Sequence, residues 1–230
     1  MKRFVVGDIH GNHRALMQCL DRSGFSLFED QLFVIGDVVD GYPDTKKVID
    51  TLLEIPNLVY IMGNHDYWAL RWVEFGELES SWLRQGGRAT LQSYQGDVPE
   101  SHKTFLRDKH EVYHLTEDGM LFVHGGIDTD IPLEEQDADD MMWDRSLVLR
   151  AHKAQLIQGE FNVPDYNRIF VGHTATEWVA HTLKPLIMGN VVALDTGAGY
   201  SGALTIMDVD TLEYWQSDYA GLLYPDDDPR

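Results

Sequence analysis

Short apolar runs of four to six residues recur along the chain and read as buried strands. The clearest runs lie at 3–6, 32–35, 58–62, 120–123 and 168–171. Further strands are expected at 111–115, 191–194, 203–208 and 212–215. Between them, apolar residues three and four positions apart predict helices at 13–22, 45–54, 66–75, 99–109 and 140–157. Strands and helices thus alternate early in the chain, and strands dominate later.

This order of elements predicts an α/β fold. The alternation through residue 75 indicates a parallel βαβαβ unit, and the strand-rich second half indicates a second sheet. Since both halves are strongly apolar, we expect the two sheets to pack face to face with helices outside. With 230 residues, 43% of them hydrophobic, and no Ser, Gly or Pro linker, we expect a single domain over 1–230. The acidic tail that starts at Tyr224, residues 225–230 above all, reads as disordered.

Polar residues of a particular kind follow five of the strands. The segments are Gly7-Asp8-Ile9-His10-Gly11, Gly36-Asp37-Val38-Val39-Asp40, Gly63-Asn64-His65-Asp66, Val123-His124-Gly125-Gly126 and Gly172-His173-Thr174. Ligands of open α/β sheets gather outside the carboxyl ends of the strands, so these five segments can converge on one point. Any single segment of this kind is more often structural than catalytic. The complete ordered set predicts a site for a pair of metal ions.

The residue types restrict the metal. Asp, His and Asn together suit borderline divalent ions such as Mn, Fe, Zn, Co or Ni, whereas an all-carboxylate set would favour Mg or Ca. Thiolate ligation is excluded because the chain has one cysteine, Cys19. That cysteine falls on the apolar stripe of the first expected helix, where we expect it to be buried.

With these motifs, the chain resembles the calcineurin-like metallophosphoesterases, and within them the phosphoprotein phosphatase branch with its small bacterial and phage serine/threonine phosphatases. The similarity extends through Trp82-Leu83-Arg84-Gln85-Gly86-Gly87, Trp143-Asp144-Arg145 and Leu194-Asp195-Thr196-Gly197-Ala198, and so covers residue 4 to about residue 208. The resemblance implies a four-layer αββα sandwich, in which two mixed β-sheets are flanked by helices.

Carried over position by position, the resemblance assigns a role to each metal ligand. Asp8 and His10 hold the first ion and Asp37 bridges both, while Asn64, His124 and His173 complete the second site. Two cations about 3.5–4 Å apart repel each other, and a shared carboxylate offsets that repulsion. Mn²⁺ is the expected ion.

Two further residues are expected to handle the leaving group. His65 follows Asn64 directly and is expected to be the general acid, and Asp40 matches the family position that hydrogen-bonds this histidine. The alternative for His65 is an imidazole that simply caps the strand end.

Phosphate binding is where the sequence departs from the family. The family's second segment normally continues Asp-Arg-Gly, but Gly41 follows Asp40 here, so one phosphate-clamping arginine is missing. Arg145 fits the position of the other such arginine and is expected to bind substrate. Alternatively, Arg145 is a surface residue paired with Asp144 or Asp140. The candidates to replace the lost charge are Arg84, Arg88, Lys46 and Lys47.

Charge and hydropathy narrow the partners. The formal net charge of −20 argues against a nucleic-acid surface, which needs a basic field. The chain has no apolar run long enough to span a bilayer and no signal segment after Met1, so we expect a cytoplasmic protein without a membrane partner. The oligomeric state is not encoded in the sequence.

Taken together, the sequence predicts an enzyme that hydrolyses phosphate monoesters by in-line attack of a metal-bound hydroxide. A protein serine/threonine phosphatase is the first interpretation, acting on a phosphorylated protein or peptide or on a small phosphate ester. A diadenosine tetraphosphatase-like nucleotide hydrolase or a phosphodiesterase is the alternative. A non-catalytic metal-binding module is a third hypothesis, which the complete ligand set disfavours.

Overall fold

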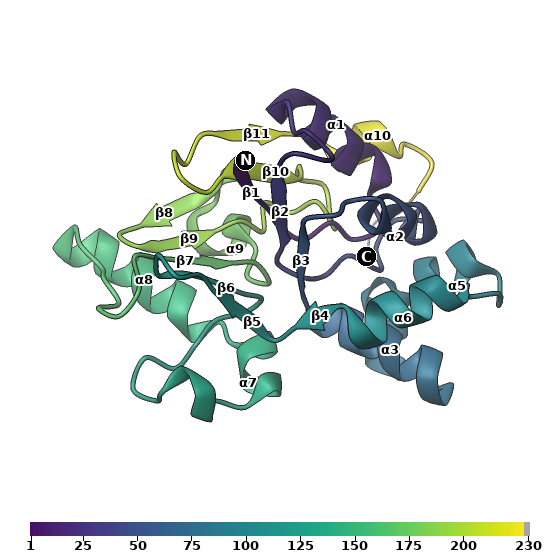
Figure 1. Ribbon diagram of the computed structural model, residues 1–230, viewed down its shortest axis with the longest axis horizontal. Helices are drawn as coiled ribbons and strands as arrows, with labels where there is room; N and C mark the ends of the chain where they lie inside the picture. Colours follow the sequence, from purple (N-terminus) through teal and green to yellow (C-terminus); the bar gives the residue numbers. More distant parts are fainter. Residues whose placement is uncertain (228–230) are drawn as a thin grey trace.

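Two β-sheets form the centre of the molecule, as seen in a computed structural model that describes residues 1–227 (Figure 1). The first sheet has the strand order β11-β10-β1-β2-β3-β4. Its strands are β1 (Arg3–Val6), β2 (Gln31–Val34), β3 (Leu58–Ile61), β4 (His110–Glu111), β10 (Thr205–Asp208) and β11 (Tyr214–Gln216). β1 to β4 are parallel, whereas β10 and β11 run antiparallel to their neighbours. The expected parallel βαβαβ unit is therefore present.

The second sheet has the order β5-β6-β7-β9-β8 and is also mixed. Its strands are β5 (Tyr113–Leu115), β6 (Met120–Val123), β7 (Arg168–Val171), β8 (Leu186–Met188) and β9 (Val191–Ala193). The parallel strands β6, β7 and β9 lie at its centre. Consequently β6 and β7 end at the same edge of the sheet.

Helices cover the outer faces of both sheets, with α2, α5 and α6 on one side of the strands and α8 on the other (Figure 1). The helices are α1 (His13–Ser23), α2 (Thr45–Leu53), α3 (Asn64–Phe75), α4 (Ser80–Trp82), α5 (Arg88–Tyr94), α6 (Glu100–Asp108), α7 (Ala138–Trp143), α8 (Ser146–Gln158), α9 (Thr176–Ala180) and α10 (Ala220–Leu223). A π-helical turn, Leu83–Gly87, joins α4 to α5, and a 3₁₀ turn, Leu133–Glu135, precedes α7.

Side-chain alternation along the strands produces three apolar layers. In β1, Phe4 and Val6 face the helices α1 and α2, whereas Val5 faces the other sheet. Phe33 and Phe122 stack between the sheets with ring centroids 3.8 Å apart. On the far side, Leu147 and Ala151 of α8 share an apolar cluster with residues of β6, β7, β8 and β9. The four-layer αββα arrangement expected from the sequence is confirmed.

Two expected elements are interrupted. The strand expected at 111–115 is divided, because β4 pairs with β3 in one sheet and β5 pairs with β6 in the other. The helix expected at 140–157 breaks after α7, where the Asp144 carboxylate accepts hydrogen bonds from the backbone N–H of Ser146 (3.1 Å) and Leu147 (3.0 Å). An Asp that binds nearby backbone N–H groups ends one helix and starts the next.

The chain also has elements that its sequence did not reveal. The helical segment from α4 to α5, the strand β8 and the short helices α9 and α10 were not expected. Tyr224, assigned to a disordered tail, is 1% exposed, and its hydroxyl donates to Asp44 Oδ2 at 2.8 Å. Residues 225–227 form a turn, and the rest of the expected tail, 228–230, lies outside the described residues. Within 1–227, no helix has the length and apolar character needed to cross a membrane.

Candidate metal centre

The strand ends of both sheets bring the six expected ligands to one place. Asp8, Asp37 and Asn64 follow β1, β2 and β3, whereas His124 and His173 follow β6 and β7. These side chains and His10 are almost fully buried, between 0% and 6% exposed. Segments that are far apart in sequence therefore form a single polar cluster between the two sheets.

The cluster divides into two groups that share one carboxylate. Asp8, His10 and Asp37 form one group, and Asp37, His124 and His173 form the other; within each, the possible ligand atoms lie within 4.8 Å of one another. His10 Nε2 is 3.5 Å from Asp37 Oδ2, and His124 Nε2 is 3.4 Å from Asp37 Oδ1. The two oxygens of Asp37 thus face opposite groups, as a bridging ligand requires.

Hydrogen bonds to backbone carbonyls orient two of the imidazoles. Nδ1 of His124 donates to the carbonyl of Ile35 at 2.7 Å, and Nδ1 of His10 donates to the carbonyl of Val39 at 3.1 Å. Each Nε2 then carries a lone pair and points into the cluster. His124 Nε2 lies 3.1 Å from Asn64 Oδ1, so lone pairs of both atoms converge where a cation would bind.

His173, in the same cluster, has an unsatisfied ring nitrogen. Its Nε2 is buried and has no hydrogen-bond partner among the described residues. Burial, together with the neighbouring His124 and Arg145, lowers the pKa of this imidazole to about 2. A neutral buried nitrogen without a partner costs free energy unless something binds it. The donor set of imidazole, carboxylate and amide oxygens therefore fits two borderline divalent ions.

Backbone strain concentrates at this site. Seven non-glycine residues among those described have positive φ, and four of them belong to the cluster or its neighbour Asp40: His10, Asp37, Asp40 and His173. Such conformations cost about 1–3 kcal/mol each and persist where the surrounding structure enforces them. Two glycines allow the close approach, because a Cβ on Gly63 would overlap Asp37 and a Cβ on Gly172 would overlap Asp8.

Asp66 supports the cluster from behind and was not expected from the sequence to do so. Its carboxylate accepts hydrogen bonds from the backbone N–H groups of Val38 (2.9 Å) and Gly63 (3.0 Å). Burial raises the pKa of Asp66, and the neighbouring charge of Asp37 raises it further. The residue joins the loop after β2 to the start of α3, and its only signal in the sequence is the last letter of GNHD.

His65 and Asp40 form a buried pair beside the two groups. Nδ1 of His65 lies 2.6 Å from Asp40 Oδ2, and the two residues are 3% and 0% exposed. The backbone N–H of His65 donates to Asp37 Oδ1 at 3.0 Å, which ties the pair to the cluster. Because Nδ1 contacts Asp40, Nε2 is on the side of the ring that faces away from that carboxylate, and His65 lines the small cavity described below. The general-acid role of His65 stays a prediction.

Arg145, the expected phosphate ligand, lines a small cavity at the cluster. A cavity of about 50 Å³ is lined by Asp8, His10, Asp37, Asn64, His65, Gln85, Trp143, Arg145, His173, Trp178, Asp195 and Tyr200. Arg145 is the one Lys or Arg in this lining among residues 1–227. Its Nη1 donates to the carbonyl of His173 at 2.7 Å, and its guanidinium lies 5.7 Å from the ring centroid of Trp178. The expected alternative, an ion pair with Asp144 or Asp140, is not present in the described part of the chain.

The cations proposed as replacements lie elsewhere. Arg84 and Arg88 are exposed and do not line this cavity, and Lys47 pairs with Asp44 at 2.7 Å. Lys46 is also exposed and outside the lining. Gln85, a neutral residue, is the member of this segment that reaches the cavity.

Gly41 has a backbone conformation that disfavours the family's arginine. Its φ is +74°, and a Cβ there would lie 3.2 Å from both Cβ and the carbonyl oxygen of His10. A side chain at this position would combine left-handed strain with crowding. The backbone conformation at position 41 therefore favours glycine over the family's arginine.

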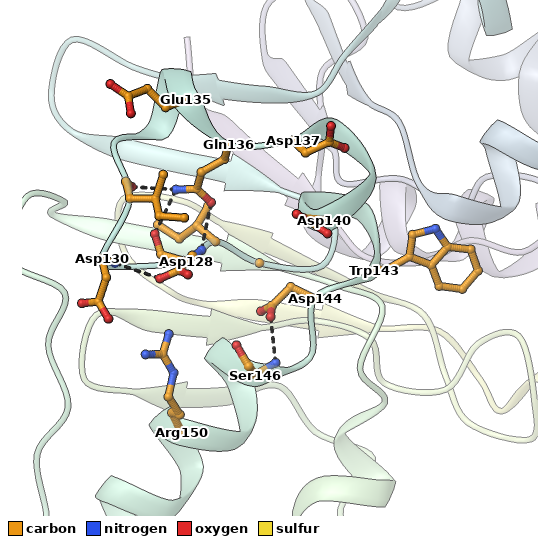
Figure 2. Close-up of a pocket in the computed structure, with 13 residues that line it drawn as sticks. Asp128, Asp130, Glu135, Gln136, Asp137, Asp140, Trp143, Asp144, Ser146 and Arg150 are labelled. Carbon is orange, nitrogen blue, oxygen red and sulfur yellow. Dashed lines mark hydrogen bonds between the residues drawn. The ribbon is translucent and has the colours of Figure 1, made fainter.

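A larger hollow of about 620 Å³ lies next to the metal cluster. Its acidic lining comes from the segment 128–144, and Figure 2 shows Trp143 pointing away from the carboxylates of Asp128, Asp130 and Asp140. Trp143 lines both cavities. The six expected ligands and His65 line or adjoin the small cavity, which makes it the candidate active site despite its smaller volume.

Comparisons of sequence and structure relate the chain to known proteins. The family model "Calcineurin-like phosphoesterase" matches residues 1–181. A symmetrical bis(5'-nucleosyl)-tetraphosphatase of Nitrosomonas europaea is 27% identical over 72% of this chain, but the match covers 60% of that enzyme, less than two thirds of its length. Serine/threonine-protein phosphatase 2 of Escherichia coli K12 is 26% identical over 90% of this chain and 92% of the relative. A crystal structure titled as a putative diadenosine tetraphosphatase has a TM-score of 0.70 at 18% identity, covering 94% of this chain and 92% of that one.

Proposed function

The chain belongs to the calcineurin-like phosphoesterases, and from this premise we propose that it is a two-metal phosphomonoesterase that acts on phosphoserine or phosphothreonine in proteins. Membership of the family makes it a hydrolase of phosphate esters. The family alone does not decide the metal, the residues that hold it or the substrate, because one fold hosts many activities.

Six residues would hold the two ions. Asp8 and His10 would hold one ion, His124, His173 and Asn64 would hold the other, and Asp37 would be shared between them. The two groups that share the Asp37 carboxylate support this division. Mn²⁺ suits this mixture of nitrogen and oxygen donors. When bound, two such ions polarise the phosphate oxygens and lower the pKa of a coordinated water, which provides the nucleophile.

The chain's own residues do the rest. Arg145 faces the cavity, and its described hydrogen bonds, to His173 and Thr174, both come from Nη1. The other N–H groups of the guanidinium can bind the equatorial phosphate oxygens. His65 donates the Nε2 proton to the leaving oxygen as the P–O bond breaks. Asp40 holds the ring at Nδ1, which keeps Nε2 directed at substrate.

The observation that carries the monoester assignment is the charge of the cavity lining. Arg145 is its single Lys or Arg among the described residues, and Asp8, Asp37 and Asp195 are the acidic residues of the same lining. Two divalent ions and one guanidinium balance these carboxylates and one phosphate group. A bridge of four phosphates carries one negative charge on each phosphate, about twice the charge of a phosphomonoester, and so needs more cations than this lining provides.

A symmetrical dinucleoside tetraphosphatase is the second candidate. The similarity to the Nitrosomonas europaea enzyme supports it, as do two exposed tryptophans at the cavity, Trp143 (42% exposed) and Trp178 (58% exposed), because such rings can stack on a base. Phosphate release from a phosphoserine peptide and from diadenosine tetraphosphate, measured side by side with Mn²⁺, separates the two candidates. We expect a higher kcat/KM for the peptide; a preference for the dinucleotide would replace the first proposal by the second.

A further inference from the structure

The Asp40 carboxylate has more partners than a simple Asp–His pair requires. Oδ2 accepts a hydrogen bond from the indole N–H of Trp82 at 2.7 Å and from His65 Nδ1 at 2.6 Å. Oδ1 accepts from the hydroxyl of Thr90 at 2.6 Å. All four residues are between 0% and 3% exposed. Three donors thus surround a charge that has no contact with bulk water, and they offset its desolvation.

Both additional donors come from the segment between α4 and α5. Trp82 ends α4 and Thr90 lies in the first turn of α5, with the π-helical turn Leu83–Gly87 between them. The backbone N–H of Gly41 donates to the carbonyl of Gly86 at 3.3 Å, and the N–H of Asp40 donates to Thr90 Oγ1 at 2.9 Å. The segment therefore holds Asp40 by its backbone and by both carboxylate oxygens.

The packing of the segment fixes the indole. A Cβ on Gly87 would lie 2.5 Å from the Trp82 ring, so only glycine lets the turn close over it. A buried tryptophan usually finds some partner for its N–H, and an ordinary core role would need no more than that. Here Asp40 itself has a strained φ of +72°, and Trp82 and Thr90 of one segment each donate a hydrogen bond to a different oxygen of its carboxylate. This arrangement orients a carboxylate as well as satisfying an indole.

We propose that Trp82 and Thr90 are positioning residues for proton donation by His65, an inference that rests on the phosphomonoesterase function proposed above. Their hydrogen bonds prevent rotation of the Asp40 carboxylate, so that Oδ2 stays aligned with Nδ1–H of His65. The ring then presents Nε2–H to the leaving oxygen, gives up that proton as the P–O bond breaks, and regains one from water afterwards. The segment that carries the Trp-Leu-Arg-Gln-Gly-Gly motif thereby supports the acid, not the metal.

The test uses the dependence of rate on the leaving group. Trp82→Phe and Thr90→Val each remove one donor and keep most of the side-chain volume, whereas Thr90→Ser restores the hydroxyl. Trp215→Phe, in the same apolar layer at β11, is the matched control. p-Nitrophenolate leaves with little help from an acid, whereas phenolate and the alkoxide of phosphoserine need a proton. We expect kcat for phenyl phosphate and a phosphoserine peptide to fall roughly tenfold in both donor-deleted variants at unchanged KM, with p-nitrophenyl phosphate nearly unaffected.

A second readout does not depend on turnover. In the metal-free protein, the Nδ1–H proton of His65, assigned by its loss in His65→Ala, should shift in the NMR spectra of Trp82→Phe and Thr90→Val and return in Thr90→Ser. Equal losses on all three substrates with an unmoved Nδ1–H resonance would overturn the proposal and leave Trp82 and Thr90 as core residues. If Trp82→Phe fails to fold, Thr90→Val decides. A wild-type protein that hydrolyses none of the esters would defeat the proposed function, and the resonance would then decide this inference alone.

Discussion

Arg145 donates a hydrogen bond of 2.7 Å from Nη1 to the backbone carbonyl of His173. The proposed phosphate ligand is thus attached to the backbone of a proposed metal ligand. Arg145 lies between α7 and α8, at the point where Asp144 caps the second helix, and His173 follows β7. The helix break therefore determines where the guanidinium lies, and a continuous helix over 140–157 would carry it elsewhere.

The first prediction concerns this guanidinium. Arg145→Ala should raise KM for a phosphomonoester by roughly 10- to 100-fold, since a hydrogen bond to a charged group contributes about 1.5–3 kcal/mol. Arg145→Lys should recover only part of the loss, because an ammonium cannot bind the His173 carbonyl and two phosphate oxygens with a planar fork. Steady-state kinetics measure this. Unchanged KM in Arg145→Ala would remove the residue from substrate binding.

Gly172 lies against the proposed metal ligand Asp8, so a substitution of this glycine should weaken metal binding. Gly172→Ala places a Cβ against the Asp8 carboxylate, so we expect Mn²⁺ affinity to fall roughly 10- to 100-fold, as it does when groups that orient ligands are disturbed. Gly221→Ala is the matched control, because nothing lies within 4 Å of the added carbon. Isothermal titration calorimetry compares the two variants. Wild-type affinity in Gly172→Ala would show that Asp8 does not need its described position.

The absent arginine provides a stability prediction. Gly41→Arg restores the family's residue on a backbone with φ of +74°, so we expect a loss of about 1–2 kcal/mol in the free energy of unfolding and no gain in activity. Gly41→Ala isolates the backbone contribution, which should account for most of the loss. Urea unfolding measures both. A Gly41→Arg protein that is as stable as wild type and more active would mean that the loop readily adopts the family's conformation.

An ion pair at the opposite end of β1 predicts a pH dependence. Arg3 donates to both carboxylate oxygens of Asp118, at 3.0 and 2.8 Å, and these bonds, with one from Thr116, lower the pKa of Asp118 to about 2. Because the pKa is lower in the folded state, the pair stabilises the protein above the unfolded pKa of about 3.9 and loses this effect as the pH falls toward 2. Asp118→Asn should cost less than about 1 kcal/mol at pH 7, since both groups are partly exposed.

Urea unfolding of Asp118→Asn and wild type at pH 7, 4 and 3 checks the sign. The difference between the two proteins should narrow as the pH falls. Glu117→Gln, in the same turn, is the control and should show no such trend. A difference that widens toward acid would mean that the Arg3 pair does not lower the pKa of Asp118.

Much of the fold followed from local patterns. β1, β6 and β7 have the expected bounds, because three or four apolar residues in a row with polar residues or glycine on either side leave little choice of element. β4 and β5 could not be separated, since 111–115 reads as one strand and only pairing with β3 or β6 distinguishes its two ends. Likewise, the sequence around Asp144 is compatible with a continuous helix. The helix breaks because the Asp144 carboxylate accepts hydrogen bonds from the first backbone N–H groups of α8.

The site shows the same division. Asp8 and His124 follow strand ends and could be chosen from sequence as candidate metal ligands, because ligands of α/β sheets bind outside the carboxyl ends of the strands. Trp82 and Thr90 could not be given a role, because their contact with Asp40 depends on a π-helical turn and on the close approach of Gly87 to the indole. The role of Asp66 could not be predicted either, because its carboxylate accepts hydrogen bonds from backbone N–H groups that reach it only in the folded loop.

The most direct test of the two-metal phosphomonoesterase is phosphate release from a phosphoserine peptide as Mn²⁺ is added stepwise to metal-free protein. The account predicts that activity rises until two equivalents are bound, and that Asp37→Asn, which removes the shared carboxylate, binds less metal and stays near background. Full loading of the wild type with two ions, without hydrolysis of the peptide or of p-nitrophenyl phosphate, would contradict the account.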